Sequence, residues 1–160
     1  MEVWIRRYIG IVSISGSALG ISAIAGYFSL HLELGQWLVL LAVCIFFIWS
    51  AYIGLRIIEG TKEISMLLQA LTVQFLQVPI ISFPAFTYQL ASGFHLDFIY
   101  STYEGLKLSI KLGSVSKFGF LEGGELVVVG INIAALVTMT LITKCLFPSP
   151  KTKAVELTRT

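Results

Sequence analysis

The chain has 160 residues, of which 56% are hydrophobic and only 12% are charged, and its formal net charge is +2. A soluble domain carries roughly 25% charged residues, so this composition is typical of a membrane protein. The mean hydropathy of +0.87 agrees with that interpretation. So small a positive charge argues against a nucleic-acid partner.

The two cysteines, Cys44 and Cys145, lie in or at the edge of apolar stretches. Neither has a neighbouring cysteine or histidine at the spacing of a metal site. We therefore expect two unpaired apolar thiols, no metal site and no cofactor.

Four apolar stretches without charge predict membrane-spanning helices, because about 20 apolar residues cross a hydrocarbon layer about 30 Å thick. The expected helices cover residues 8–30, 36–57, 64–81 and 125–147. The first stretch is longer than the core of a signal peptide, so we expect a retained helix. Residues 1–81 would then form three crossings and residues 125–147 a fourth.

Basic residues indicate the orientation of these helices. They precede the first stretch, follow the second and recur in the tail 148–160, whereas the loop 31–36 has none. The positive-inside rule then places both termini in the cytoplasm and residues 82–124 on the extracytoplasmic side. We expect an integral protein of a bacterial inner membrane with a basic cytoplasmic tail.

The segment 82–124 has the period-two pattern of β-strands. Along residues 94–100 and 106–112, aromatic or aliphatic residues alternate with mostly polar ones, and residues 116–121 place Phe118 and Phe120 on one face. An antiparallel meander of about three strands follows, with residues 85–90 as a candidate fourth. An amphipathic helix over 106–121 is the alternative, which Gly113 and Gly119 disfavour.

One face of this meander is apolar and must be covered by the helices, the membrane surface or another protein, because an isolated hairpin is marginally stable. We interpret it as a candidate partner surface. Its residues are Phe94, Leu96, Phe98, Tyr100, Leu106, Leu108, Ile110, Phe118 and Phe120.

Polar side chains within the third and fourth stretches predict how those helices pack. At 1.5 Å per residue, Gln77 and Asn132 lie at one depth, and Gln69 and Thr140 at another. Amides in hydrocarbon need partners, so we expect Gln77 beside Asn132 and Gln69 beside Thr140. A polar pathway for a substrate or ion is the alternative, although no acidic or basic residue lies mid-span.

Gly16 and Gly20 form a GxxxG motif in the first stretch. Small residues at this spacing let two helices approach closely. Packing within the monomer is one interpretation, and self-association is the other.

The sequence favours a non-enzymatic binding or accessory protein, either immunity-like or a complex subunit, that acts through its β module. A small oligomeric transporter or channel subunit is the alternative. A membrane enzyme that uses His95 and Asp97 is the second alternative. No motif of nucleophilic or metal catalysis accompanies that pair, so we expect a solvated polar face and no catalytic residues.

Overall fold

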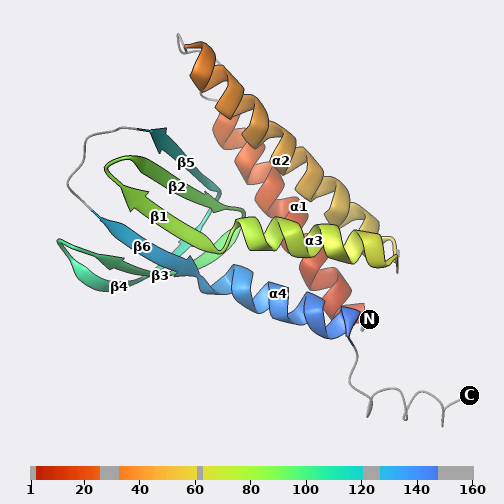
Figure 1. Cartoon of the computed structure of the whole chain (residues 1–160). Coiled ribbons are helices and arrows are strands. Elements are labelled where there is room, and N and C mark those ends of the chain that lie inside the picture. The colour runs from red at the N-terminus through yellow and green to blue at the C-terminus, as the bar shows by residue number, and fades with distance from the viewer. Residues whose placement is uncertain (1–2, 26–32, 61–62, 121–126, 148–160) are drawn as a thin grey trace, which may run out of the picture.

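The protein folds as four helices and one six-stranded antiparallel sheet (Figure 1). The computed structural model describes residues 3–25, 33–60, 63–120 and 127–147. In chain order the elements are α1 (Val3–Ala25), α2 (Leu34–Ile58), α3 (Ile64–Leu76), β1 (Pro79–Phe83), β2 (Phe86–Ala91), β3 (Phe94–Ser101), β4 (Gly105–Leu112), β5 (Val115–Phe120), β6 (Val128–Asn132) and α4 (Ile133–Leu146).

The two N-terminal helices lie side by side as a long pair (Figure 1). They approach closely where Gly10 meets Gly54, because a Cβ on Gly54 would lie 3.0 Å from the carbonyl oxygen of Gly10. By length and composition, α1 and α2 are the two helices in the described ranges that could cross a membrane. A signal sequence or the core helix of a soluble protein would have the same length and composition.

The expectation of four membrane-spanning helices is wrong. Helices α3 and α4 have 13 and 14 residues, so each is about 20 Å long and shorter than a bilayer core of about 30 Å. Pro79 has no N–H to donate, and the chain leaves the helix just before it and enters β1. In the segment 125–147, where the fourth helix was expected, residues 128–132 instead form β6. Helix α4 begins only at Ile133, after Asn132 as its N-cap.

The meander of three strands is also wrong, because the sheet has six strands in the order β4-β3-β6-β1-β2-β5. Strands β3 and β4 form the expected hairpin, and β2 lies where the candidate fourth strand was expected. Strand β5, however, pairs with β2 and not with β4. The extra strands β1 and β6 come from segments expected to be helical, and the alternative of a helix over 106–121 is wrong as well.

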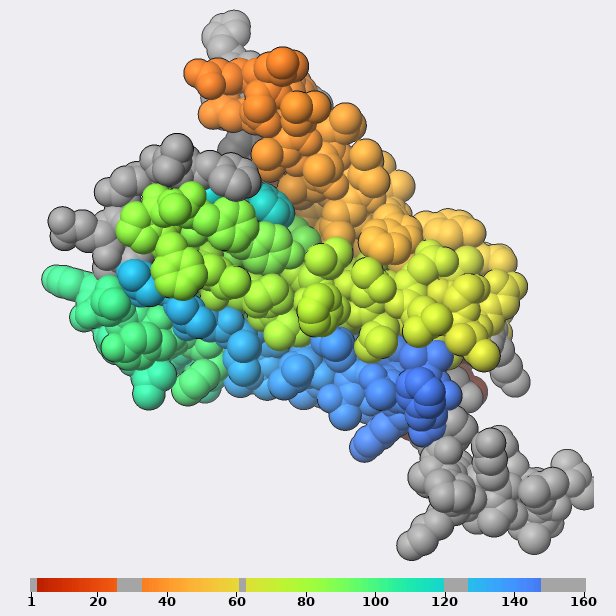
Figure 2. All heavy atoms as spheres, viewed as in Figure 1, coloured from red at the N-terminus to blue at the C-terminus, as the bar shows by residue number. Residues whose placement is uncertain are grey.

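The antiparallel pair β1–β6 continues directly into the antiparallel pair α3–α4. In Figure 2 the side chains of α3 and α4 meet along the length of both helices. These two helices therefore do pack side by side as expected, although neither is long enough to cross a membrane.

The sheet is strongly curled, and its two connections β2–β3 and β4–β5 meet at one end. The backbone N–H of Gly113 donates to the carbonyl of Gly93 at 2.8 Å. We call Ser92, Gly93, Gly113 and Ser114 the tip of the sheet. The tip docks on the middle of α1, where the hydroxyl of Ser114 donates to the carbonyl of Gly16 at 2.6 Å.

Residues opposite each other on paired antiparallel strands share a face, so the register defines two faces of the sheet. The outer face is mainly apolar, with Ser116 opposite Leu90 as a polar exception. Its β2–β5 end, with Tyr88, Leu90 and Phe118, packs against the core that the four helices share. The inner, concave face carries most of the polar strand residues, including His95 and Asp97 on β3.

Candidate functional site

Seven of the nine residues of the candidate partner surface lie on the outer face of the β3–β4 hairpin. The register pairs Leu96 with Ile110, Phe98 with Leu108 and Tyr100 with Leu106. Leu106 and Ile110 are 68% and 67% exposed. The hairpin therefore presents one continuous apolar surface within the described residues.

Three further residues extend this surface, and the sequence interpretation missed them. Leu112 lies opposite Phe94, and Val129 and Ile131 of β6 lie beside Tyr100 and Phe98. The two β6 residues were missed because their segment was taken for a helix. We call the whole set the contact surface: Phe94, Leu96, Phe98, Tyr100, Leu106, Leu108, Ile110, Leu112, Val129 and Ile131.

Phe118 does not belong to the contact surface. It lies on β5, packs edge-to-face on Tyr88 with ring centroids 5.3 Å apart, and contributes to the helical core. The side chain of Phe120 lies outside the described part of the chain. Tyr88 donates its hydroxyl to the carbonyl of Leu76 at 2.5 Å, and its burial raises its pKa above the ordinary value.

Two lysines of β4 lie on the opposite, inner face of the hairpin. Lys107 forms an ion pair with Glu104 at 3.1 Å, and Lys111 lies opposite His95. Strand β4 pairs with β3 along one edge, and no other described strand pairs with its second edge. The hairpin is thus apolar on one face, basic on the other and open at its edge.

His95 and Asp97 form a pair that is sealed inside the protein. The His95 Nδ1 and Asp97 Oδ2 atoms are 2.8 Å apart, and both side chains are 0% exposed. The expectation of a solvated polar face is therefore wrong, because the curl of the sheet encloses these positions. Gln89 donates to Asp97 at 3.5 Å, whereas His95 Nε2 and Asp97 Oδ1 have no partner among the described residues.

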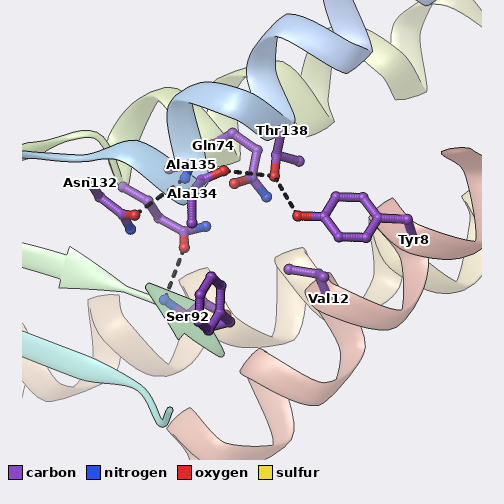
Figure 3. Close-up of a pocket in the computed structure, with 10 residues that line it drawn as sticks. Tyr8, Val12, Gln74, Ser92, Asn132, Ala134, Ala135 and Thr138 are labelled. Carbon is purple, nitrogen blue, oxygen red and sulfur yellow. Dashed lines mark hydrogen bonds between the residues drawn. The ribbon is translucent and has the colours of Figure 1, made fainter. Parts of the chain in front are cut away.

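A cavity of about 160 Å³ lies where α1, α3 and α4 meet the tip of the sheet (Figure 3). Gln77 and Asn132, which were expected to lie together, both line it. Asn132 Oδ1 accepts from the N–H of Ala135 at 3.2 Å and so caps α4. The lining is completed by Tyr8, Val12, Gln74, Ser92, Phe94, Ala134, Ala135 and Thr138.

Gln69 and Thr140 do not form the expected pair. The indole of Trp49 on α2 donates to Gln69 at 3.1 Å, and Thr140 donates to the carbonyl of Leu136 in its own helix. The depth count assumed straight helices over 64–81 and 125–147. Since α3 ends at Leu76 and α4 begins at Ile133, that count does not describe how these two residues lie.

Gly16 and Gly20 are both buried within the chain. A Cβ on Gly16 would lie 2.2 Å from Ser92 Oγ, and one on Gly20 would lie 2.5 Å from the ring of Phe47. The motif therefore serves two contacts inside the monomer, one with the tip of the sheet and one with α2.

No group of three or more histidine, cysteine, aspartate or glutamate side chains that could hold a metal ion occurs within the described ranges. Neither Cys44 nor Cys145 forms a disulfide within the described residues. No family model, curated protein or solved structure matches the chain.

Proposed function

We propose that this chain is a non-enzymatic membrane protein that binds a partner protein through its contact surface and the open edge of β4. The contact surface is the observation that carries the proposal. Leu108 and Leu112 are 59% and 83% exposed, and apolar surfaces of this kind mark interaction sites. An accessory subunit and an immunity-type protein are both functions of this class.

The membrane part of the proposal is supported by the outward surfaces of α1 and α2. Large apolar side chains on these helices are exposed, among them Ile11, Leu41, Ile45 and Ile48. We assign the chain to the inner membrane of a bacterium within the same proposal, because its candidate membrane segments are helices and not strands of a closed barrel.

The open edge of β4 favours a partner that adds a strand to the sheet. Such an edge presents unpaired backbone N–H and C=O groups to any extended segment. A segment paired along β4 would place its alternate side chains beside Leu106, Leu108 and Ile110 on the outer face. This is β-augmentation, in which backbone hydrogen bonds give affinity and side-chain contacts give specificity.

Charge favours a different protein over a second copy of this chain. If two β4 strands paired antiparallel about Ser109, Lys107 of one copy would lie opposite Lys111 of the other. Like charges directly opposite each other destabilise a strand pair. A partner strand with acidic residues on its inner face would instead form favourable pairs with both lysines.

Site-specific photocross-linking in the producing cells tests the proposal. With a photoreactive phenylalanine analogue in place of Leu108, we expect an adduct with one protein, at an extended segment that contains Asp or Glu. The double variant Lys107→Glu/Lys111→Glu should reduce that adduct at least tenfold. The same analogue at Ser116, which is exposed on the other edge strand β5, is the control.

The proposal is overturned if Leu108 cross-links to lipid, to a second copy of the chain or to nothing. An adduct that persists unchanged in the Lys107→Glu/Lys111→Glu variant would also overturn it, because the charge pairing would then have no role.

A further inference from the structure

The cavity beside the tip of the sheet contains polar groups whose hydrogen-bonding capacity the protein leaves unused. The hydroxyl of Ser92 is buried and has no partner in the described part of the chain. Gln74 is only 4% exposed as a residue and lines the cavity, and no side-chain hydrogen bond of its amide occurs among the described residues. The Ser92 hydroxyl is packed against α1 at Gly16, so the Gln74 amide is the unpaired group that indicates a polar occupant.

Other polar groups in the lining are held in place by the protein. Gln77 accepts from the N–H of Ser92 at 2.9 Å and donates to the carbonyl of Val73 at 3.2 Å. Thr138 donates to the carbonyl of Ala134 at 2.9 Å (Figure 3). Because these side chains are fixed, the Gln74 amide lines a preformed space.

The lining contains no charged side chain. An ion would therefore enter a buried site without a countercharge, which is strongly unfavourable. The Gln74 amide offers a donor and an acceptor side by side, and the hydroxyl groups of Tyr8 and Thr138, which also line the cavity, can act as either. This set suits an uncharged molecule that has both kinds of group.

Size and shape restrict the occupant further. A cavity of about 160 Å³ is similar in size to protein cavities of about 150 Å³ that bind benzene, so the occupant is a small molecule. Val12, Ala134 and Ala135 provide apolar walls for a short carbon skeleton. Phe94, which is 43% exposed, also lines the cavity.

We propose that this cavity binds a small uncharged molecule with adjacent hydrogen-bond donor and acceptor groups, for which a primary carboxamide is the simplest representative. The Gln74 amide pairs with the polar end of the molecule, and the alanine and valine side chains contact its carbon end. The cavity shares Phe94 with the contact surface, but the Gln74 amide and the other polar groups of the lining lie outside that surface.

The test is a titration of the full-length protein in nanodiscs with acetamide, followed by NMR of the ¹⁵N-labelled side-chain amides. We expect saturable shifts of the Gln74 and Asn132 signals. Acetate has similar size and a negative charge, and acetone lacks the donor. Both should bind at least tenfold more weakly than acetamide.

Gln74→Met keeps the size of the side chain and removes its amide, so it should weaken acetamide binding at least tenfold. Gln69→Met is the matched control on the same helix, because Gln69 contacts Trp49 and lies outside the cavity. Ala134→Val fills the cavity and should abolish binding in a folded protein, so it decides the matter if Gln74→Met fails to fold. Equal binding of acetate, no saturable shift, or unchanged affinity in Ala134→Val would overturn the proposal.

Discussion

At the scale of single residues, the buried His95–Asp97 pair is the most consequential polar feature of the sheet. Both side chains are fully buried, and each has a further atom without a partner among the described residues. Removing one member of a buried pair is costly because the other member is left unpaired, whereas replacing both by apolar side chains costs less. The pair therefore allows a double-mutant test.

We expect Asp97→Val alone to lower the free energy of unfolding by about 3–5 kcal/mol, because His95 then stays buried without its partner. The double variant His95→Leu/Asp97→Val should be more stable than Asp97→Val alone. Urea unfolding in detergent, followed by circular dichroism, measures both differences. Losses that simply add in the double variant would show that the two side chains do not stabilise each other.

At the scale of elements, the docking of the sheet on α1 depends on close backbone contact at one glycine. A Cβ on Gly16 would lie 2.6 Å from the carbonyl carbon of Ser92 and 2.7 Å from the amide nitrogen of Gly93. These are backbone atoms in a tight connection, so they cannot move aside as a flexible side chain would. The sheet tip and α1 therefore have to separate if a side chain is added.

We expect Gly16→Ala to lower the free energy of unfolding by about 1–3 kcal/mol, the usual cost of overpacking. Gly35→Ala on α2 is the control, because a Cβ there meets nothing within 4 Å. That control should leave stability unchanged or slightly raised, since alanine favours a helix more than glycine does. Thermal unfolding of both variants in the same detergent measures the difference. Equal melting temperatures would contradict the close contact between the tip of the sheet and α1 at Gly16.

The elements also show how far the sequence predicts this fold. Strands β3 and β4 could be predicted because their period-two pattern is clear, and α1 and α2 because their apolar stretches are long. Strands β1 and β6 could not be predicted in the same way. Consecutive residues of a strand point to opposite faces, and both members of the pairs Ile80–Ile81 and Val128–Val129 are apolar, so the sequence shows no alternation there. Their tertiary pairing with each other decides their conformation.

The candidate site, too, could be predicted from the sequence only where a local pattern reveals it. The apolar surface of the hairpin could be predicted from local alternation, whereas Val129 and Ile131 join it only because β6 lies next to β3. Gln77 and Asn132 do come together at the cavity. Gln74 could not be identified from its residue type, because only the structure distinguishes it from Gln69, which has a partner in Trp49.

At the scale of the whole molecule, ten polar side chains of the described residues are buried beside the hydrophobic core, while many large apolar side chains are exposed. The buried polar residues come from helices and strands alike, and a soluble monomer rarely exposes so large an apolar area. The buried polar set is Ser13, Ser17, Ser50, Gln74, Gln77, Ser92, His95, Asp97, Asn132 and Thr138. This distribution supports the proposed insertion of α1 and α2 in a membrane.

Fluorescence quenching by brominated lipids tests that insertion at two adjacent positions of α2. Ile48 is 60% exposed, whereas Trp49 is partly buried and donates a hydrogen bond to Gln69. Helix α2 has 25 residues, and both positions lie within about 5 Å of its midpoint at 1.5 Å per residue. If α2 is centred in the membrane, both are therefore near the middle of a hydrocarbon layer about 30 Å thick. A tryptophan at position 48 should therefore contact acyl chains directly, whereas Trp49 should be shielded by α3.

The experiment compares a variant whose only tryptophan is Trp49 with one that carries Ile48→Trp and Trp49→Phe, both without Trp4 and Trp37. In liposomes with bromine deep in the acyl chains, we expect stronger quenching at position 48. Lipids brominated near the headgroups should quench position 48 less than the deeply brominated lipids do. If α2 is instead the core helix of a soluble protein, neither lipid will quench either position, and sodium carbonate will release the protein from membranes.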